Sequence, residues 1–469
     1  MIKRLIYTLL TLLLLLPPHP VIAQDQPTGP VYIVQEGDNL NTIAAQFGVS
    51  VTDLMTANNI SDANLISIGM QLTIPGVTGV KGYLTTVTIP LGASLQSLSR
   101  AYNMPASTLT QINRLVSPAA TYAGAPLILA LPQLTEQPSL TSVAPLLPGS
   151  SPLQFAVQHN TSPWTVILQN DLSSPWQLPA GESLALNSTA LNTPWGNPNL
   201  QEIVITPLPI QQGGTTTIHV RTNQSATLSG SLADKELHFF ADGDNDQVAL
   251  QGIYRMNKPG IYPFRLKAVF ANGSSYEFEQ TVLLKPMPSI FDYPLSVDPT
   301  TTDPNTTKTE DELVRNLTAQ ATPTRYWQGT FTAPIDVAPK YRLYPDCVTS
   351  DYGNLRSYNG SPYNFYHTGL DLFACGNTLN IYAPAAGVVV FADNLTVRGG
   401  YTVIDHGWGV YSAYGHQSEI RVQVGDHVEA GQLIGLIGKT GRVDGPHLHW
   451  EVWVNGILVN PVEWLKNNF

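Results

Sequence analysis

One spacing occurs three times in the N-terminal part of the sequence. An asparagine is followed eleven positions later by a glycine, and each glycine leads into an apolar stretch: QLTIP, PLILALP or SLAL. The three pairs are Asn58 with Gly69, Asn113 with Gly124, and Asn170 with Gly181. Self-similarity at so short a period predicts copies of one small supersecondary unit, and it argues against a single large N-terminal domain.

The first copy, residues 31–76, has the pattern of a strand, two helices and a second strand. It opens with VYIVQ, after which Asp38 is placed to cap a short helix that buries Leu40 and stops at Gly48. Ser50 can open a second helix, and a second strand ends at the dipeptide IP. The sequence therefore predicts a β-α-α-β unit.

This first unit resembles a LysM module, a family that binds glycans containing N-acetylglucosamine, such as peptidoglycan. The second unit, 82–132, and the third, 147–188, are degenerate matches, although Leu40, Leu95 and Leu153 occupy comparable positions. The resemblance predicts LysM-like repeats in all three and glycan binding by the first. For the second and third, glycan binding and a spacer role are both open alternatives.

Two further segments precede the C-terminal domain. Residues 203–286 alternate with period two in stretches such as TTTIHVRT and SYEFEQTVLL, separated by turn-forming residues, which predicts a small immunoglobulin-like β-sandwich. Residues 287–325 are rich in Pro, Thr, Asp and Asn and are predicted to be a linker, with a short helix capped by Thr309 and Glu312. With a last domain at 326–469, the chain is predicted to be multidomain and mostly β.

The N-terminus predicts export. Lys3 and Arg4 precede a largely apolar run of twelve residues, which is too short to span a bilayer but typical of a signal-peptide core. Residues 1–23 are therefore expected to form a signal peptide cleaved after Ala23, with an uncleaved anchor as the alternative. No membrane partner is expected after cleavage, and a formal net charge of −11 argues against a nucleic-acid partner.

Export also determines how the only two cysteines, Cys347 and Cys375, are interpreted. Outside the cytoplasm they can stay oxidised, and a disulfide closing this loop would contribute roughly 3–4 kcal/mol. Free thiols are the alternative. Zinc ligation by these cysteines is disfavoured because the C-x₂-C spacing is absent.

Histidines concentrate near the C-terminus, where six of the ten lie in the last 103 residues. In YHTGLDL, Asp371 follows His367 by four positions, so both side chains can share one face and converge on one ion. A further imidazole from GPHLHWEV, either His447 or His449, would complete a set of three protein ligands. Such a set leaves the fourth position of a tetrahedral zinc ion open to water, as in catalytic zinc sites.

The H-x-H pair suggests two roles on one strand. Residues two apart in a strand point to the same face, roughly 6.5–7 Å apart, so one histidine can bind the metal while the other lies near the bound water. Zinc lowers the pKa of that water to roughly 7, and the second imidazole can exchange its proton during amide hydrolysis. His416, in YSAYGHQS, is predicted to lie nearby and to stabilise the oxyanion.

Together these stretches resemble the lysostaphin-type zinc endopeptidases of bacterial cell walls. YHTGLD, AYGH and GPHLHWEV occur in the order of that family, over about 326–469. The resemblance implies a mostly antiparallel sheet crossed by a groove, with Zn²⁺ bound by His367, Asp371 and His449.

The same resemblance implies roles for three further residues. His447 matches the catalytic histidine of the H-x-H pair, and His416 matches the second active-site histidine. Asn359, in LRSYNG, falls where the family has a stretch along the groove and is predicted to contact substrate.

The sequence therefore predicts a secreted, cell-wall-associated zinc metalloendopeptidase that hydrolyses peptide cross-links of peptidoglycan. LysM modules would bind the glycan and the catalytic groove would bind the peptide, so that tethering raises the local substrate concentration. Two alternatives are a non-catalytic wall-binding activator of another hydrolase and an endopeptidase that acts on secreted proteins.

Overall fold

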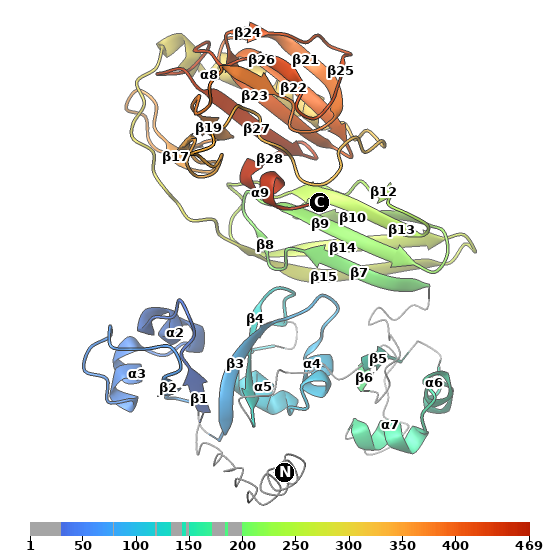
Figure 1. Ribbon diagram of the computed structural model, residues 1–469. Helices are drawn as coiled ribbons and strands as arrows, with labels where there is room; N and C mark the ends of the chain where they lie inside the picture. Colours follow the sequence, from blue (N-terminus) through green and yellow to red (C-terminus); the bar gives the residue numbers. More distant parts are fainter. Residues whose placement is uncertain are drawn as a thin grey trace, which may run out of the picture. The chain divides into compact units, whose positions relative to one another are not determined.

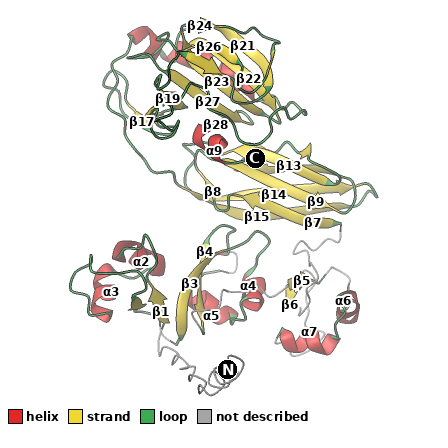
Figure 2. Cartoon of the chain, viewed as in Figure 1, coloured by secondary structure: helices red, strands yellow, loops and turns green. Residues whose placement is uncertain are grey.

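A computed structural model describes most of the chain (Figure 1). Strands predominate in it, which confirms the prediction of a mostly β protein (Figure 2). The predicted signal peptide, 1–23, lies outside the described residues. Within the described part of the chain, no helix combines the length and apolar character needed to cross a bilayer. The described ranges are 30–77, 79–117, 120–132, 143–146, 150–170, 183–185 and 199–469.

The first repeat has the predicted order of elements. They are β1 (Pro30–Ile33), α2 (Leu40–Phe47), α3 (Val51–Ala57) and β2 (Gln71–Thr73), and the two strands pair antiparallel. Ser50 caps α3 as predicted. The predicted cap of α2 was wrong by one residue, because the side chain of Asn39 accepts the Thr42 N–H. Asp38 accepts from the Tyr32 hydroxyl instead.

The second and third repeats follow the same order. The second comprises β3 (Gly82–Thr88), α4 (Leu95–Ala101), α5 (Ala106–Ile112) and β4 (Pro126–Leu131), and the third comprises β5 (Val143–Pro145), α6 (Pro152–Gln158), α7 (Pro163–Gln169) and β6 (Ser183–Ala185). Leu40 and Leu95 are buried, but the proposed counterpart Leu153 is 62% exposed. That match was wrong, since α6 buries Phe155 and Ala156.

The repeated asparagine fastens a helix end to the closing strand. The Asn58 side chain donates to the carbonyl of Thr73 at 2.8 Å and accepts its N–H at 2.6 Å. Asn113 makes the same two bonds to Ile128, at 2.8 and 2.7 Å. One amide side chain thus satisfies both polar groups of a strand residue, which explains why an asparagine recurs at this point.

Two sheets form the domain that follows. One has the order β11-β10-β14-β15-β8 and the other β12-β13-β9-β7. Their strands are β7 (Leu200–Thr206), β8 (Ile210–Gln211), β9 (Thr215–Thr222), β10 (Ala226–Leu232), β11 (Lys235–Glu236), β12 (Phe240–Ala241), β13 (Asp246–Gly252), β14 (Gly260–Phe270) and β15 (Ser275–Lys285). Both sheets contribute to one core, for example Ile218 and Phe264, and its immunoglobulin-like topology stays a prediction.

The predicted linker has more structure than its composition indicates. It contains the 3-10 helix η3 (Pro299–Thr302) and the helix α8 (Pro304–Thr318). Asp303 caps α8, so the predicted cap at Thr309 was wrong, and Thr309 lies inside the helix. Proline at the first helical position and aspartate before it are favourable start signals.

The C-terminal domain is built on an antiparallel sheet of eight strands, in the order β16-β19-β27-β23-β22-β21-β25, with β28 also paired to β27. These strands are β16 (Val348–Ser350), β19 (Leu370–Leu372), β21 (Gly387–Leu395), β22 (Gly399–Gly407), β23 (Val410–Gln417), β25 (His427–Val428), β27 (Leu448–Val454) and β28 (Ile457–Val459). Two smaller sheets and a helix complete it: β17 (Leu355–Arg356) with β18 (Phe365–Tyr366), β20 (Asn380–Tyr382) with β24 (Glu419–Ile420) and β26 (Leu433–Leu436), and α9 (Pro461–Lys466).

The core of this domain extends beyond its predicted boundary. Val248 and Leu250 of β13 belong to the same buried cluster as Trp450 of β27. The predicted disulfide is confirmed, since Cys347 and Cys375 are bonded to each other and both are buried in this cluster.

Candidate metal centre

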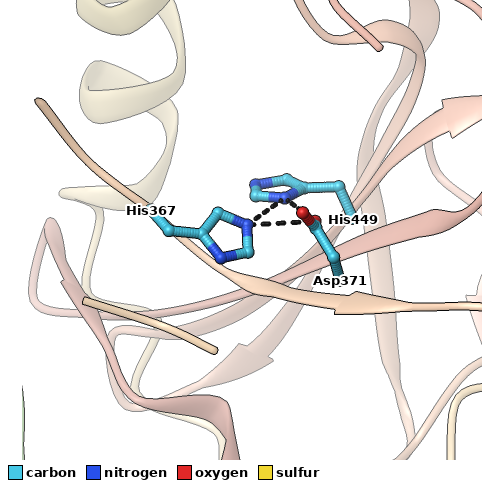
Figure 3. A group of neighbouring side chains, drawn as sticks. All are labelled: His367, Asp371 and His449. Carbon is cyan, nitrogen blue, oxygen red and sulfur yellow. Dashed lines mark hydrogen bonds and ion pairs between the residues drawn. The ribbon is translucent and has the colours of Figure 1, made fainter. Parts of the chain in front are cut away.

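The three predicted metal ligands point toward one another (Figure 3), and they come from β19, β27 and the segment before β19. Asp371 on β19 lies directly opposite His449 on β27 in the antiparallel register, and His367 comes just before β19. His449 Nδ1 lies 2.8 Å from Asp371 Oδ1 and 3.1 Å from His367 Nε2. The distance from His367 Nε2 to Asp371 Oδ1 is 3.0 Å. One donor atom from each of these buried residues therefore faces a common point.

Gly369 is required by the close approach of two strands. A Cβ atom at this position would lie 2.4 Å from the Trp450 carbonyl oxygen and 3.0 Å from the ring of His449. Any side chain would therefore displace the imidazole or its strand. The glycine of the HTGLD motif thus makes room for the histidine that faces the aspartate.

The orientation of His449 is fixed by Glu451, two residues further along β27. Nε2 of His449 lies 3.1 Å from Glu451 Oε1, and an ionised carboxylate can only accept, so Nε2 carries a proton. Burial alone would lower the pKa of His449, but the hydrogen bonds to Asp371 and Glu451 raise it above its ordinary value. A cation that binds Nδ1 therefore displaces a proton from it.

His367 faces the ligand group with Nε2, whereas His449 faces it with Nδ1. Nδ1 of His367 lies 2.9 Å from the Asp351 carbonyl oxygen and donates to it, so Nε2 is left with its lone pair toward the ligand group. Burial, followed by the positive charge of Arg356, lowers the pKa of His367 to about 4. The ring is therefore neutral near pH 7, which is the form that binds metals.

Asp371 uses its two oxygens differently. Oδ1 faces the two histidines, and Oδ2 accepts from Arg356 Nη2 at 2.6 Å. Burial alone would raise the pKa of Asp371, but the adjacent imidazoles, His367 first among them, hold it well below its ordinary value. The carboxylate is therefore ionised, with one oxygen held away from the ligand group.

The two predicted catalytic histidines lie beside these ligands. His447 Nε2 is 3.4 Å from Asp371 Oδ1, and the rings of His447 and His416 are 5.0 Å apart between centroids. His416 is buried and adopts a left-handed backbone conformation, φ +65°, which is uncommon outside glycine. Its Nδ1 donates to the Thr440 carbonyl at 2.8 Å. Burial and the neighbouring imidazoles lower the pKa of His416, so the ring is neutral.

A cavity of about 630 Å³ opens onto the site. His367, His416 and His449 line it on the sheet side. Further lining residues come from elements outside the predicted C-terminal domain: Tyr254 and Met256 of the two-sheet domain, and Asp311 and Arg315 of α8. The two-sheet domain and α8 therefore share in forming the cavity onto which the histidines open.

Asn359 is engaged elsewhere. Its side chain accepts the Val297 N–H at 2.9 Å and donates to the Val297 carbonyl at 3.0 Å. It thus holds the segment that leads into α8, and it is not among the residues that line the cavity. Its contact with substrate stays a prediction.

Sequence reasoning did not identify the residues that hold the ligands. Glu451 has a recognisable signal, because it follows His449 by two positions on a strand and so shares its face. Arg356, Ser350 and Asp351 have none, since they lie on β17, on β16 and in the segment between these strands, with no periodic relation to the ligands.

The donor set suits zinc. Two imidazole nitrogens and one carboxylate oxygen all lie within 4.8 Å of one another, and among the described residues this group has no fourth His, Cys, Asp or Glu. Three protein ligands of this kind are typical of catalytic zinc sites, and the hydrogen bonds described above orient each donor. The side chains present therefore fit the metal.

Comparison with known proteins identifies two kinds of domain. Residues 365–461 match peptidase family M23, and residues 32–75 and 88–130 match the LysM domain. The chain thus contains an M23 peptidase domain and LysM domains, in agreement with the resemblances drawn from the sequence.

Similar proteins share only part of the chain. The peptidoglycan DD-endopeptidase ShyA of Vibrio cholerae is 45% identical over 97 residues, 21% of this chain and 22% of ShyA. The murein hydrolase activator EnvC of Escherichia coli is 41% identical over 85 residues, 18% of this chain and 20% of EnvC. The catalytic domain of lysostaphin from Staphylococcus simulans is 26% identical, with 30% of this chain and 90% of that domain covered and a TM-score of 0.21. The chain spans about a fifth of the length of the curated relatives it matches.

Proposed function

We propose that this protein is a zinc-dependent endopeptidase that hydrolyses peptide cross-links in peptidoglycan. The observation that carries the proposal is the convergence of His367 Nε2, Asp371 Oδ1 and His449 Nδ1 in an M23 domain, with the second hydrogen-bonding atom of each group held by another residue. The LysM domains support the choice of peptidoglycan as substrate, because both kinds of domain point to the same polymer.

The protein's own residues would orient the substrate and move protons. When bound, Zn²⁺ supplies Lewis-acid chemistry, polarising a carbonyl and lowering the pKa of a water molecule to about 7. His447 lies within reach of the ligand group and is assigned the transfer of a proton from water to the leaving amine.

The hydrogen bond of His416 bears on its role. Its proton lies on Nδ1, where it is donated to Thr440, so in the neutral ring Nε2 can only accept. Stabilising an oxyanion would require a second proton, which burial disfavours. We therefore assign Nε2 of His416 as a hydrogen-bond acceptor beside His447, and the oxyanion role inferred from the sequence stays a prediction.

Location follows from the same proposal. A wall hydrolase must reach the wall, and the apolar run after Lys3 and Arg4 is the feature that would direct export. The LysM domains would then keep the enzyme on its substrate, which makes encounter of the second site intramolecular.

A second candidate is a non-catalytic activator of another hydrolase. It is favoured by one observation, the similarity of the C-terminal domain to a protein named murein hydrolase activator. The intact donor set favours the enzyme, because an activator has no need of ionised and neutral groups oriented toward one point.

The test is digestion of purified sacculi by the chain without its first 23 residues, followed by mass spectrometry of the released muropeptides. Hydrolysis of peptide bonds is expected, with loss of activity in a chelator and recovery when zinc is added. His449→Ala should lose both zinc and hydrolysis, whereas His427→Ala, an exposed histidine outside the site, should keep both. Purified protein that binds zinc but releases no cleaved peptide would favour the activator.

A further inference from the structure

A stretch of the predicted linker runs beside the candidate metal centre. Phe291 and Leu295 form parallel bridges with Leu355 and Tyr358, at and just after β17. Backbone hydrogen bonds join the two segments, including Asp292 N–H to the Leu355 carbonyl at 3.0 Å. These linker residues lie well before the part of the chain that matches the M23 family.

Asp292 is the residue of this stretch that points inward. Its Oδ2 accepts from Arg356 Nε at 3.1 Å and from Ser350 Oγ at 2.7 Å, while its Oδ1 accepts from Asn354 Nδ2 at 2.8 Å. The side chains of Asp292 and Arg356 are only 18% and 12% exposed. Burial strengthens such a charged hydrogen-bond network relative to the same contacts in water.

Two of these partners contact the metal ligands directly. Arg356 Nη2 donates to Asp371 Oδ2 at 2.6 Å and to Ser350 Oγ at 3.0 Å. Ser350 Oγ lies 3.1 Å from His367 Nδ1. Because the serine proton is donated to Asp292, its oxygen is left to accept from the histidine, sharing the Nδ1 proton with the Asp351 carbonyl. One linker carboxylate is thus connected to two of the three ligands.

From this network we infer that Asp292 is a positioning residue for the metal centre, and that the linker is part of the zinc site. The inference rests on the proposed zinc function. Its first physical basis is charge: Arg356 neutralises Asp371, and Asp292 restores one negative charge next to the cation site.

The second basis is orientation. Asp292 holds the guanidinium so that only Oδ2 of Asp371 is engaged and Oδ1 faces the histidines. It also fixes the hydroxyl of Ser350, which supports the protonated Nδ1 of His367. Groups that orient metal ligands in this way typically change metal affinity by 10–100-fold when they are removed.

A purely structural role would be to attach the linker to the C-terminal domain. The chain offers a matched control for that role, because the Tyr363 hydroxyl donates to the Asp292 backbone carbonyl at 2.9 Å. Tyr363→Phe removes one bond that attaches the linker, leaves the Asp292 carboxylate in place, and keeps the aromatic contact with Phe291.

The experiment measures Zn²⁺ affinity by competition with a chromophoric chelator in the full chain without its first 23 residues. Asp292→Asn keeps the shape of the side chain and removes its charge, and it is expected to bind Zn²⁺ about tenfold more weakly than wild type. Tyr363→Phe should stay within about twofold of wild type. Ser350→Ala removes the path to His367 and leaves the direct path from Asp292 through Arg356 to Asp371, so it should give an intermediate loss.

The outcomes separate the inference from the proposed function. Wild-type affinity in Asp292→Asn would overturn the inference, and so would an equal loss in Tyr363→Phe, because that result would reflect linker attachment alone. If Asp292→Asn does not fold, the affinity of Ser350→Ala decides, with a value equal to wild type counting against the inference. Wild-type protein that binds no Zn²⁺ would instead refute the zinc site and the proposed function.

Discussion

Replacement of Glu451 by glutamine should weaken both the fold and the metal site. The buried carboxylate accepts from four donors. Oε1 receives His449 Nε2 at 3.1 Å and Thr368 Oγ1 at 2.9 Å, and Oε2 receives the Tyr401 hydroxyl and Trp453 Nε1 at 3.1 Å. Both oxygens of the carboxylate are thus used by two donors each.

The size of the effect follows from this geometry. Glutamine has one acceptor oxygen and an NH₂ group, so two of the four donors would face another donor. A hydrogen bond to a charged group contributes about 1.5–3 kcal/mol, so the free energy of unfolding should fall by about 3–6 kcal/mol. If the NH₂ group faces His449, the proton on Nε2 loses its carboxylate acceptor and keeps only the weaker contact with Thr368 Oγ1, so Zn²⁺ affinity should fall by 10–100-fold.

Denaturant unfolding of the metal-free protein and chelator competition measure the two effects separately. Glu419→Gln is the control, because Glu419 is exposed, pairs only with Arg421 on the surface, and should change stability by no more than about 0.5 kcal/mol. A Glu451→Gln variant that unfolds like wild type and binds Zn²⁺ within twofold of wild type would refute the role assigned to Glu451.

Three further predictions concern catalysis, the disulfide and pH. His447→Ala should lower muropeptide release by about 10²–10⁴-fold while Zn²⁺ content is retained, and unchanged release would contradict the role of His447. Replacing Cys347 and Cys375 by alanine opens a loop with a sequence separation of 28 residues and should lower the free energy of unfolding by about 3.5 kcal/mol, measured in denaturant. Burial raises the pKa of Glu463 from 4.5 to about 7, so its contribution to stability is complete below pH 4.5 and is lost as pH rises through 7. Relative to Glu463→Gln, the wild type should lose about 3 kcal/mol between pH 4.5 and pH 8, and parallel pH profiles of unfolding would contradict this.

The repeats were predictable because the asparagine that recurs in them makes local hydrogen bonds that the unit requires. Asn58 and Asn113 each satisfy both backbone groups of one strand residue, so the residue type and the spacing recur together. The wrong cap at Asp38 also has a local cause. Aspartate and asparagine cap helices about equally well, so the residue types alone do not tell which of the neighbours Asp38 and Asn39 precedes the first helical residue. Leu153 was misassigned because an apolar residue in a short helix does not reveal which face is buried.

At the candidate site, the residues that could touch a metal were predictable and those that hold them were not. His367, Asp371 and His449 are identified by residue type and spacing, and the structure brings them together. Arg356 contacts Asp371 directly, and Asp292 contacts Arg356 only because β17 and the linker lie side by side. That proximity is a property of the tertiary fold, so no local sequence pattern reports it.

The composition of the linker underestimates how much of this segment is ordered. A segment rich in Pro, Thr, Asp and Asn cannot bury a core of its own, which favours disorder when the segment is considered alone. The same short polar side chains, however, are suited to backbone and charged partners that another domain provides. Glu310 of α8 accepts the N–H of Val397 at 2.9 Å, and Asp292 accepts from Arg356, so the segment is ordered by the C-terminal domain. A domain that starts at residue 326 would therefore lack polar partners of its own buried groups, which is why we infer that the functional unit includes Asp292.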